Sequence, residues 1–222
     1  GLTRASGGRW SGPAGKGPGG ERPCLPLSPS PGHAGPIEKR ARHRRCPITA
    51  APVASSTQTK AGATPRPPSV LILTKNEEMN IEACIRTLTF SDDIVVLDSY
   101  STDRTLELAE KFPNVRVVQR KFDTWSRHSN WALENIAFKN PWVYYSDADE
   151  RVTPELRDEI LRLINAPGNA CDAYRLRYKN MFLGRWLRFG GVYPVWIIRL
   201  FKPDRIRYED REVNAHPVVT GT

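Results

Sequence analysis

Short apolar runs alternate with helical patterns from residue 69 onward, and this alternation most constrains the fold. The apolar runs cover residues 69–73, 94–97, 115–118 and 142–145. The amphipathic patterns after them span 81–88, 106–112, 126–138 and 154–164, the last behind the helix-start signal Thr153-Pro154. Strands that alternate with helices build βαβ units with parallel strands. We therefore predict an α/β fold with a mainly parallel, Rossmann-like sheet flanked by helices.

The pattern changes after residue 170. Tyr174, Leu176 and Tyr178 alternate with Arg175 and Arg177, as in a half-exposed strand. Aromatic residues and Gly-containing turns follow. We expect this part to form strands and loops that wrap the end of the sheet.

The first 68 residues differ from the rest in composition. They hold 11 Gly, 12 Pro and 11 Lys/Arg against two acids, so the whole net charge of +9 lies there. Without an apolar period they cannot form a core, and we expect residues 1–68 to be a disordered basic tail. Because the chain begins with Gly and its first Met is Met79, we also expect a fragment or an uncertain start, with a tail that need not be native. Residues 69–222 are then expected to form one domain.

Polar clusters follow three of the apolar runs. They are Thr74 to Glu78, Asp98 to Asp103, and Asp147 to Glu150. Ligands of open α/β sheets bind outside the carboxyl ends of the strands, so we expect the three clusters to share one site.

Asp147 and Asp149 are the most informative residues of that expected site. If the strand continues through them, both carboxylates project to the same side and repel each other unless a cation joins them. A hard divalent ion, Mg²⁺ or Mn²⁺, suits such ligands and is commonly shared with substrate phosphates. The chain has no glycine-rich phosphate loop, which agrees with phosphate binding through a cation. The alternative is a solvated turn after the strand.

In these segments the sequence resembles glycosyltransferase family 2, of GT-A fold. The resemblance rests on residues 70–78, on Val96-Leu97-Asp98-Ser99 with 101–105, and on Asp147-Ala148-Asp149. Residues 199–201 and 208–214 extend it toward the branch with lipopolysaccharide-core glucosyltransferases.

The resemblance implies roles for six residues of the donor side. Thr74 and Asn76 would lie near the nucleotide, Asp98 would contact the base, and Asp147 and Asp149 would hold metal and donor. Asp103 would shape the pocket or only cap the next helix. An ordinary strand-to-helix loop is the alternative for residues 74–76.

The sequence departs from the family at two positions. Ser129 stands where relatives often have Arg or Lys before the Asn that matches Asn130, and Arg127 or His128 could supply that charge. Ala215 stands where relatives often carry Glu, so the general base would come from Glu209, Asp210 or Glu212, with Asp210 as our choice. We further expect the catalytic domain to be incomplete after Thr222.

The predicted function is a metal-dependent inverting glycosyltransferase. It would move a sugar from a nucleotide-diphosphate sugar to a glycan or lipid-linked acceptor of the cell envelope, of lipopolysaccharide type. The alternatives are a nucleotidyltransferase, an inactive fragment that keeps the donor pocket, and a protein that binds nucleic acid through its basic tail. No apolar run approaches the roughly 18 residues of a membrane span. We expect a cytoplasmic protein, able to work at the inner face of the cytoplasmic membrane with at most peripheral contact.

Overall fold

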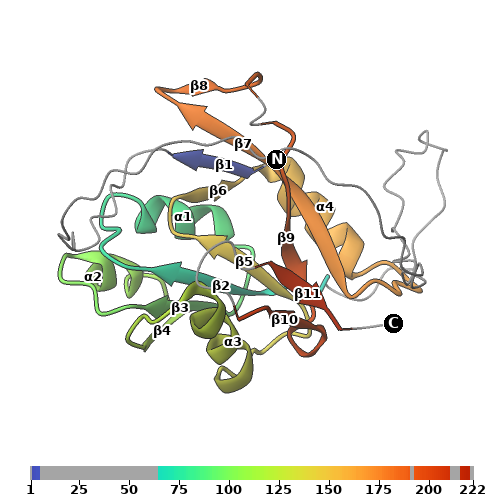
Figure 1. Cartoon of the computed structure of the whole chain (residues 1–222), viewed down its shortest axis with the longest axis horizontal. Coiled ribbons are helices and arrows are strands. Elements are labelled where there is room, and N and C mark those ends of the chain that lie inside the picture. The colour runs from blue at the N-terminus through green and yellow to red at the C-terminus, as the bar shows by residue number, and fades with distance from the viewer. Residues whose placement is uncertain (1, 6–64, 191–192, 211–215, 221–222) are drawn as a thin grey trace, which may run out of the picture. The chain divides into compact units, whose positions relative to one another are not determined.

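Four parallel strands form the first half of the sheet (Figure 1). They are β2 (Ser69–Thr74), β3 (Ile94–Asp98), β4 (Val115–Gln119) and β5 (Val143–Asp147), in the spatial order β4-β3-β2-β5. Every residue of β2 and β3 is buried, as expected for parallel strands covered on both faces. The computed structural model describes residues 2–5, 65–190, 193–210 and 216–220.

Helices cover both faces of these strands, and alternate strand residues meet different helices. The helices are α1 (Ile81–Leu88), α2 (Thr105–Ala109), α3 (Trp125–Asn135) and α4 (Pro154–Ile164). Val70 and Ile72 pack in one core cluster with α1, α2 and α4, while Leu71 and Leu73 pack in a second cluster with α3. The predicted α/β fold, with parallel strands flanked by helices, is thus confirmed.

The predicted helix boundaries hold well at the N-terminal ends and less well at the C-terminal ends. Thr153 accepts a hydrogen bond from the Leu156 amide at 3.3 Å, which confirms the cap before Pro154. α2 ends at Ala109 rather than near Phe112, and α3 ends at Asn135 rather than Phe138. Phe138 lies after α3 but still packs against the second core cluster. A helical spacing of apolar residues therefore continues beyond the end of the helix itself.

The second half of the sheet is mixed, and here the expectation of strands that merely wrap the sheet's end is wrong. β9 (Trp196–Phe201) lies between β5 and β7 (Ala173–Phe182) and is antiparallel to both. β6 (Glu150–Val152) and β1 (Leu2–Ala5) complete this side, and β8 (Arg185–Trp186) forms a hairpin with β7. The chain therefore extends one nine-stranded sheet instead of covering its edge.

The prediction of an alternating strand after residue 170 is confirmed, whereas the expectation of disorder before residue 69 fails in part. The alternation in β7 is confirmed, since Tyr174, Leu176 and Tyr178 are buried and the arginines between them are exposed. The expectation of disorder for residues 1–68 fails at Leu2–Ala5, where β1 pairs parallel with β7 and antiparallel with β6. Residues 6–64 lie outside the described part of the chain.

A small two-stranded sheet lies beside α3. β10 (Ile206–Tyr208) follows the short 3₁₀ turn η1 (Pro203–Arg205) and pairs antiparallel with β11 (Pro217–Val219). The side-chain amide of Asn130 in α3 accepts a hydrogen bond from the Tyr208 amide and donates one to its carbonyl, both at 2.8 Å. This bidentate contact fixes where the segment after β10 starts.

His128, also in α3, is a buried neutral residue. Its Nδ1 lies 2.8 Å from Nη1 of Arg120, which can only donate, so the ring accepts there and carries its proton on Nε2. Burial, and next the charge of Arg120, lower the pKa of His128 to about 4. His128 therefore does not supply the positive charge that Ser129 lacks.

We predict that His128 makes the protein less stable in mild acid. Its folded pKa lies below its unfolded value, so the unfolded chain takes up a proton that the folded chain does not. Stability should be full above about pH 6.5 and fall by up to about 3 kcal/mol as the pH drops to 4. Urea denaturation at several pH values in this range should show that the free energy of unfolding depends less steeply on pH in His128→Phe than in the wild type. His216→Phe is the matched control, because that side chain is exposed; an equal slope in wild type and His128→Phe would contradict the prediction.

Candidate functional site

The three polar clusters meet at one edge of the parallel strands, as predicted. In the strand register Thr74 is paired with Asp98, and Leu73 with Asp147. β2, β3 and β5 therefore end at the same level, and the loops after them form one continuous edge.

The loops after β2 and β3 hold each other. The Asn76 amide donates to Oγ of Ser101, and Oδ1 of Asn76 accepts from the Thr102 amide, both at 2.8 Å. Asn76 has a φ of 53° and Tyr100 a φ of 58°, left-handed values that are uncommon for residues other than Gly. Such backbone strain, held by hydrogen bonds between loops, is a frequent property of binding sites.

Asp98 organises the loop that follows it. The residue is fully buried, and Oδ2 accepts from the Ser101 amide at 2.9 Å and from Nε2 of Gln119 at 3.1 Å. Its Oδ1 accepts from the Ser101 hydroxyl. In this arrangement both carboxylate oxygens bind the protein itself. Beside Asp98, the buried hydroxyl of Thr74 has no hydrogen-bond partner among the described residues.

Asp103 also has a structural role. Its Oδ1 accepts from the amide and hydroxyl of Thr105 at the start of α2, and its Oδ2 accepts from the Glu78 amide at 3.1 Å. Burial acts to raise the pKa of Asp103, but these hydrogen bonds outweigh it and hold the pKa below its usual value. Asp103 is thus both a helix cap and a brace between two loops.

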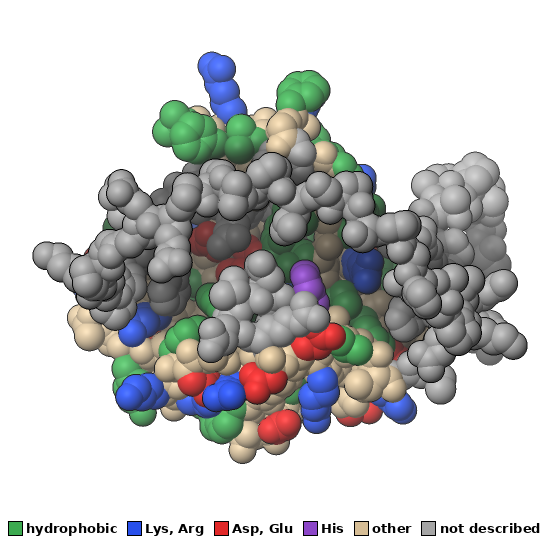
Figure 2. Space-filling model, viewed as in Figure 1, with side chains coloured by type: hydrophobic (Ala, Val, Ile, Leu, Met, Phe, Trp, Pro, Cys, Tyr) green, Lys and Arg blue, Asp and Glu red, His purple; other side chains and the backbone are tan. Residues whose placement is uncertain are grey.

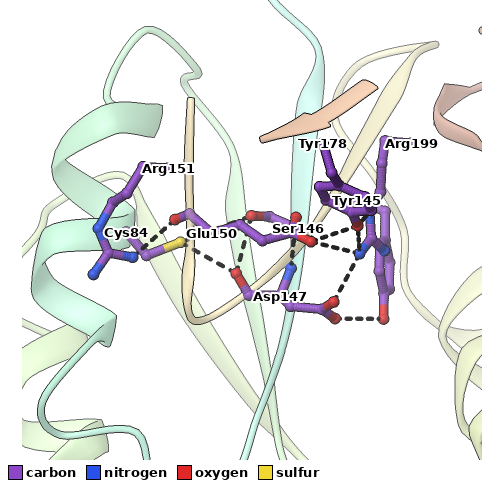
Figure 3. Close-up of polar contacts among 8 residues, drawn as sticks. All are labelled: Cys84, Tyr145, Ser146, Asp147, Glu150, Arg151, Tyr178 and Arg199. Atoms are coloured by element: carbon purple, nitrogen blue, oxygen red, sulfur yellow. Dashed lines mark hydrogen bonds and ion pairs between the residues drawn. The ribbon is translucent and has the colours of Figure 1, made fainter. Parts of the chain in front are cut away.

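Asp147 lies in a charged cluster that the sequence analysis did not predict (Figure 3). Its Oδ2 is 2.7 Å from Nη2 of Arg199, and its Oδ1 accepts from the Tyr145 hydroxyl at 3.0 Å. Nη2 of Arg199 also lies 2.6 Å from Oε1 of Glu150, and Tyr178 donates to the same Oε1 at 2.5 Å. We call Tyr145, Asp147, Glu150, Tyr178 and Arg199 the arginine cluster.

The arginine cluster carries two carboxylates against one guanidinium in a largely buried position. Arg199 is 5% exposed and Glu150 is fully buried. Burial raises the pKa of Glu150 to about 7; Arg199 opposes that shift, and Asp147 adds to it. The guanidinium lies over the ring of Tyr145, with Cζ 4.3 Å from the centroid, so its faces and its donors are both used.

Asp149 does not project beside Asp147 in the way the strand argument predicted. β5 ends at Asp147 and β6 begins at Glu150, so Asp149 lies in the turn between them. Arg151 fixes this turn by donating to the carbonyls of Ala148 and Glu150 at 3.3 and 2.8 Å. The i, i+2 geometry of an extended strand therefore does not apply to this pair.

The edge nonetheless has an excess of negative charge. Burial raises the pKa of Glu77 although Asn80 donates to it, and the charges of Asp149, Asp103 and Asp147 raise it further. No three His, Cys, Asp or Glu side chains in the described ranges converge as a ready-made metal site. A divalent cation held here would thus take at most two protein carboxylates and complete its shell from water or substrate, which is the usual arrangement for Mg²⁺. The residues at the edge fit a cation of that kind.

The three candidates for a general base fall in different situations. Asp210 is exposed and binds Arg127 of α3 through both oxygens, at 3.3 Å to Nε and 3.2 Å to Nη2. Glu209 is exposed, and Glu212 lies outside the described residues, as does Ala215. Burial raises the pKa of Tyr208 to about 12, and Arg199 and Asp147 both act on it, so the segment before Asp210 reaches the arginine cluster.

One feature of the sequence does point to the arginine cluster. Arg199 stands inside the apolar run 195–201, which forms a buried strand. An arginine in such a run needs carboxylate partners, because an unpaired buried charge is costly. Glu150 belongs to the polar cluster after the apolar run 142–145, and Tyr178 to the alternating run after residue 170, but neither pattern indicated a buried arginine as partner.

Comparisons with known proteins identify the family to which the chain is similar. A family model described as Glycosyl transferase family 2 matches residues 69–218. An uncharacterized glycosyltransferase of Rickettsia bellii is 39% identical over 93 residues, which cover 41% of this chain and 31% of that protein. The lipopolysaccharide core biosynthesis glycosyltransferase LpsC of Rhizobium meliloti is 32% identical over 147 residues, 64% of this chain and 53% of that protein. The chain thus spans about half or less of the length of these relatives.

Solved structures resemble the chain over part of its length. The S. aureus protein TarS 1-349 covers 62% of this chain and 47% of its own, at a TM-score of 0.41 and 20% identity. The glucosyl-3-phosphoglycerate synthase of Mycobacterium tuberculosis, solved with Mn²⁺, uridine diphosphate and phosphoglyceric acid, covers 37% of this chain and 33% of its own, at a TM-score of 0.32 and 26% identity. Among the residues described here, no helix is long and apolar enough to cross a membrane.

We predict that Arg199 stabilises the fold chiefly by neutralising Glu150 and Asp147. Arg199→Met should lower the free energy of unfolding by about 3–5 kcal/mol, because it leaves two carboxylates without their counter-charge. The double variant Arg199→Met/Glu150→Gln should recover part of that loss, since one of the uncompensated charges is removed. Urea denaturation of the two single variants and the double variant measures the coupling. Losses that simply add would show that the two side chains do not depend on each other.

Proposed function

The chain belongs to glycosyltransferase family 2, and from that membership we propose that it acts as a metal-dependent inverting glycosyltransferase. The donor would be a nucleotide-diphosphate sugar bound at the edge formed by β2, β3 and β5. The observation that carries the proposal is the meeting of the three family segments at this edge, with Asp147 and Asp149 beside Glu77 and Asp103.

Asp149 and Asp147 are the residues that would hold the divalent cation, Mg²⁺ or Mn²⁺. Asp149 lies in the turn at the strand end, whereas Asp147 is held by Arg199 and would contribute while remaining in the arginine cluster. When bound, the cation would neutralise the charge of the diphosphate. The carboxylates at this edge otherwise repel an anionic donor, which gives the cation a physical reason to be required.

The nucleotide would bind over the two braced loops. The strained residues Asn76 and Tyr100 lie in them, and Thr74 and Asp98 lie beneath. Because the carboxylate oxygens of Asp98 accept hydrogen bonds from Ser101 and Gln119, we propose that Asp98 acts on the nucleotide mainly by fixing the shape of the loop. A direct contact with the base would require these hydrogen bonds to be exchanged.

On the acceptor side, a carboxylate would take the proton of the attacking hydroxyl. Attack on the anomeric carbon from the face opposite the diphosphate would invert its configuration. We propose Asp210 for this role, with Glu209 and Glu212 as the other candidates. Asn130 supports the assignment by fixing the backbone at Tyr208, next to the arginine cluster.

The acceptor that we propose is a glycan or lipid-linked molecule of the cell envelope. The likeness to LpsC, whose name assigns it to lipopolysaccharide core biosynthesis, supports this class. An acceptor of this kind is assembled at a membrane, so we propose that the protein works at the inner face of the cytoplasmic membrane.

We predict that nucleotide binding depends on a divalent cation and on Asp149. A panel of UDP-, GDP- and dTDP-sugars, each with Mg²⁺, Mn²⁺ or EDTA, should raise the melting temperature for one nucleotide only when metal is present. When the ligand is in hundredfold excess over its Kd, binding should raise the free energy of unfolding by roughly 2.7 kcal/mol. Asp149→Asn should abolish this gain, and Asp158→Asn, an exposed residue of α4, should keep it. An equal gain in EDTA would refute the metal requirement.

We predict that Asp210→Asn lowers the rate of sugar transfer without weakening donor binding. Loss of a general base typically costs about 10²–10⁴ in rate. The measurement is release of nucleoside diphosphate in the presence of core oligosaccharide, together with the thermal shift for the donor. Asp204→Asn, in η1, is the exposed control. Unchanged turnover in Asp210→Asn would remove this residue from the mechanism and leave Glu209 and Glu212.

A further inference from the structure

The strand β7 extends beyond the core that buries its first half. From Tyr174 to Tyr178 every second residue is buried, but no residue from Lys179 to Phe182 is. Neither core cluster of the described residues includes a side chain between 179 and 195. In Figure 1 the end of β7 and the paired β8 lie at the margin of the sheet. The β7–β8 hairpin is therefore supported by backbone pairing and not by a hydrophobic core.

The tip of this hairpin is apolar, which is unusual for such a turn. Phe182 pairs with Arg185, so Leu183 and Gly184 form a two-residue turn, with φ values of 47° and 74°. Two left-handed residues define the type I′ turn, in which Asn-Gly is favoured and Leu is disfavoured. Leu183 is nonetheless 85% exposed, and Phe182 and Phe189 are 53% and 88% exposed. Both the left-handed backbone at Leu183 and the exposure of these apolar side chains are unfavourable for the stability of the hairpin.

The segment that carries the tip has charges of a single sign, and Lys179 within it also acts electrostatically on Glu155 of α4. Between Asp172 and Asp204 the sequence has seven Lys or Arg residues and no Asp or Glu. Arg199 is buried in the arginine cluster and Lys202 pairs with Asp172. The other five lie on the hairpin and its approach: Arg175, Arg177, Lys179, Arg185 and Arg188.

Trp186 holds some of these charges beside the apolar residues. Arg188 lies over its ring with Cζ 4.5 Å from the centroid, and Nζ of Lys179 lies at 5.2 Å. Tyr193 packs edge-on against the same ring at 4.9 Å. The space-filling view has hydrophobic and basic side chains together at the top, where Figure 1 shows β8 (Figure 2). Apolar and cationic groups are therefore presented on one hairpin.

We propose that the β7–β8 hairpin is a docking surface for a bilayer that contains anionic lipid. Leu183, Phe182 and Phe189 would enter the boundary between headgroups and acyl chains, and Arg185, Arg188 and Lys179 would contact the lipid phosphates. Exposed apolar residues combined with basic residues are the chemistry that binds such an interface. A purely anionic polymer would use the charges and not the apolar tip. A second copy of this chain would bring five like charges against five.

The position of the hairpin gives this docking a consequence for the candidate site. Tyr178 of the arginine cluster and Phe182 at the tip belong to the same strand, four residues apart. At about 3.3 Å per residue they are separated by about 13 Å along β7. A bilayer at the tip would therefore lie near the edge where Asp147 and Arg199 meet. The docking itself rests on the hairpin alone and not on the proposed reaction.

Vesicle binding of the full chain tests the proposal. With vesicles of 70% phosphatidylcholine and 30% phosphatidylglycerol, the protein should co-sediment, and much less with phosphatidylcholine alone. Leu183→Asn is the decisive variant, because Asn-Gly is the favoured pair for this turn and the hairpin should be kept or strengthened. Combined with Phe189→Ser, it should reduce binding at least tenfold while the melting temperature is unchanged or higher. Arg185→Glu should weaken binding to anionic vesicles by more than the about fivefold expected for loss of one basic residue.

Two controls separate the hairpin from other sources of binding. Met79→Asn removes another exposed apolar side chain, 86% exposed, and should leave binding unchanged. Replacing the basic residues between 39 and 45 by Ser tests the N-terminal segment, which also carries positive charge. Vesicle binding that survives Leu183→Asn/Phe189→Ser but is lost in the segment variant would overturn the proposal. So would self-association of the wild type that the same double variant abolishes, since the hairpin would then be an interface between copies.

Discussion

The ion pair of Arg199 with Asp147 and Glu150 joins the two halves of this structure. Asp147 ends the last parallel strand, Glu150 begins β6, and Arg199 belongs to the antiparallel β9. A buried guanidinium is tolerated only with carboxylate partners, and a buried Glu150 only with a guanidinium. The register of β9 beside β5 is therefore tied to the charges at the strand ends, because a slip of one residue would turn Arg199 to the other face of the sheet.

This dependence gives the candidate site a rigid support from outside the parallel strands. The motif residues 74–78, 98–103 and 147–149 all lie in the first half, but the carboxylate of Asp147 is oriented by Tyr145 and Arg199. Asp98 and Asp103 similarly accept hydrogen bonds from backbone amides of the loops at this edge. Much of the acidic character of the family segments thus maintains the shape of the edge. Glu77, whose pKa is raised by burial, is held from within its own loop by the side-chain amide of Asn80.

The sequence allowed the parallel half to be predicted because its signals are local. A buried parallel strand is a continuous apolar run, and caps such as Thr153 and stripes such as Ile81 to Leu88 identify the helices between strands. β9 could not be placed in this way, since its insertion between β5 and β7 is a pairing between distant segments. The expected i, i+2 alignment of Asp147 and Asp149 failed for a related reason: the strand ends at Asp147, two residues earlier than that argument required, and boundaries are less well encoded than elements.

The arginine cluster and the β7–β8 hairpin place cationic residues in opposite environments. In the inner half of β7 and β9, Arg199 is buried and donates to Tyr178 and to two carboxylates. On the hairpin, Arg185 and Arg188 lie beside exposed apolar groups in a segment, 173–203, whose sequence holds no acid, while Lys179 acts electrostatically on Glu155 of α4. Charge that only stabilises a fold is normally balanced within it. Exposed basic side chains next to an exposed apolar turn are instead suited to bind an anionic, partly apolar partner.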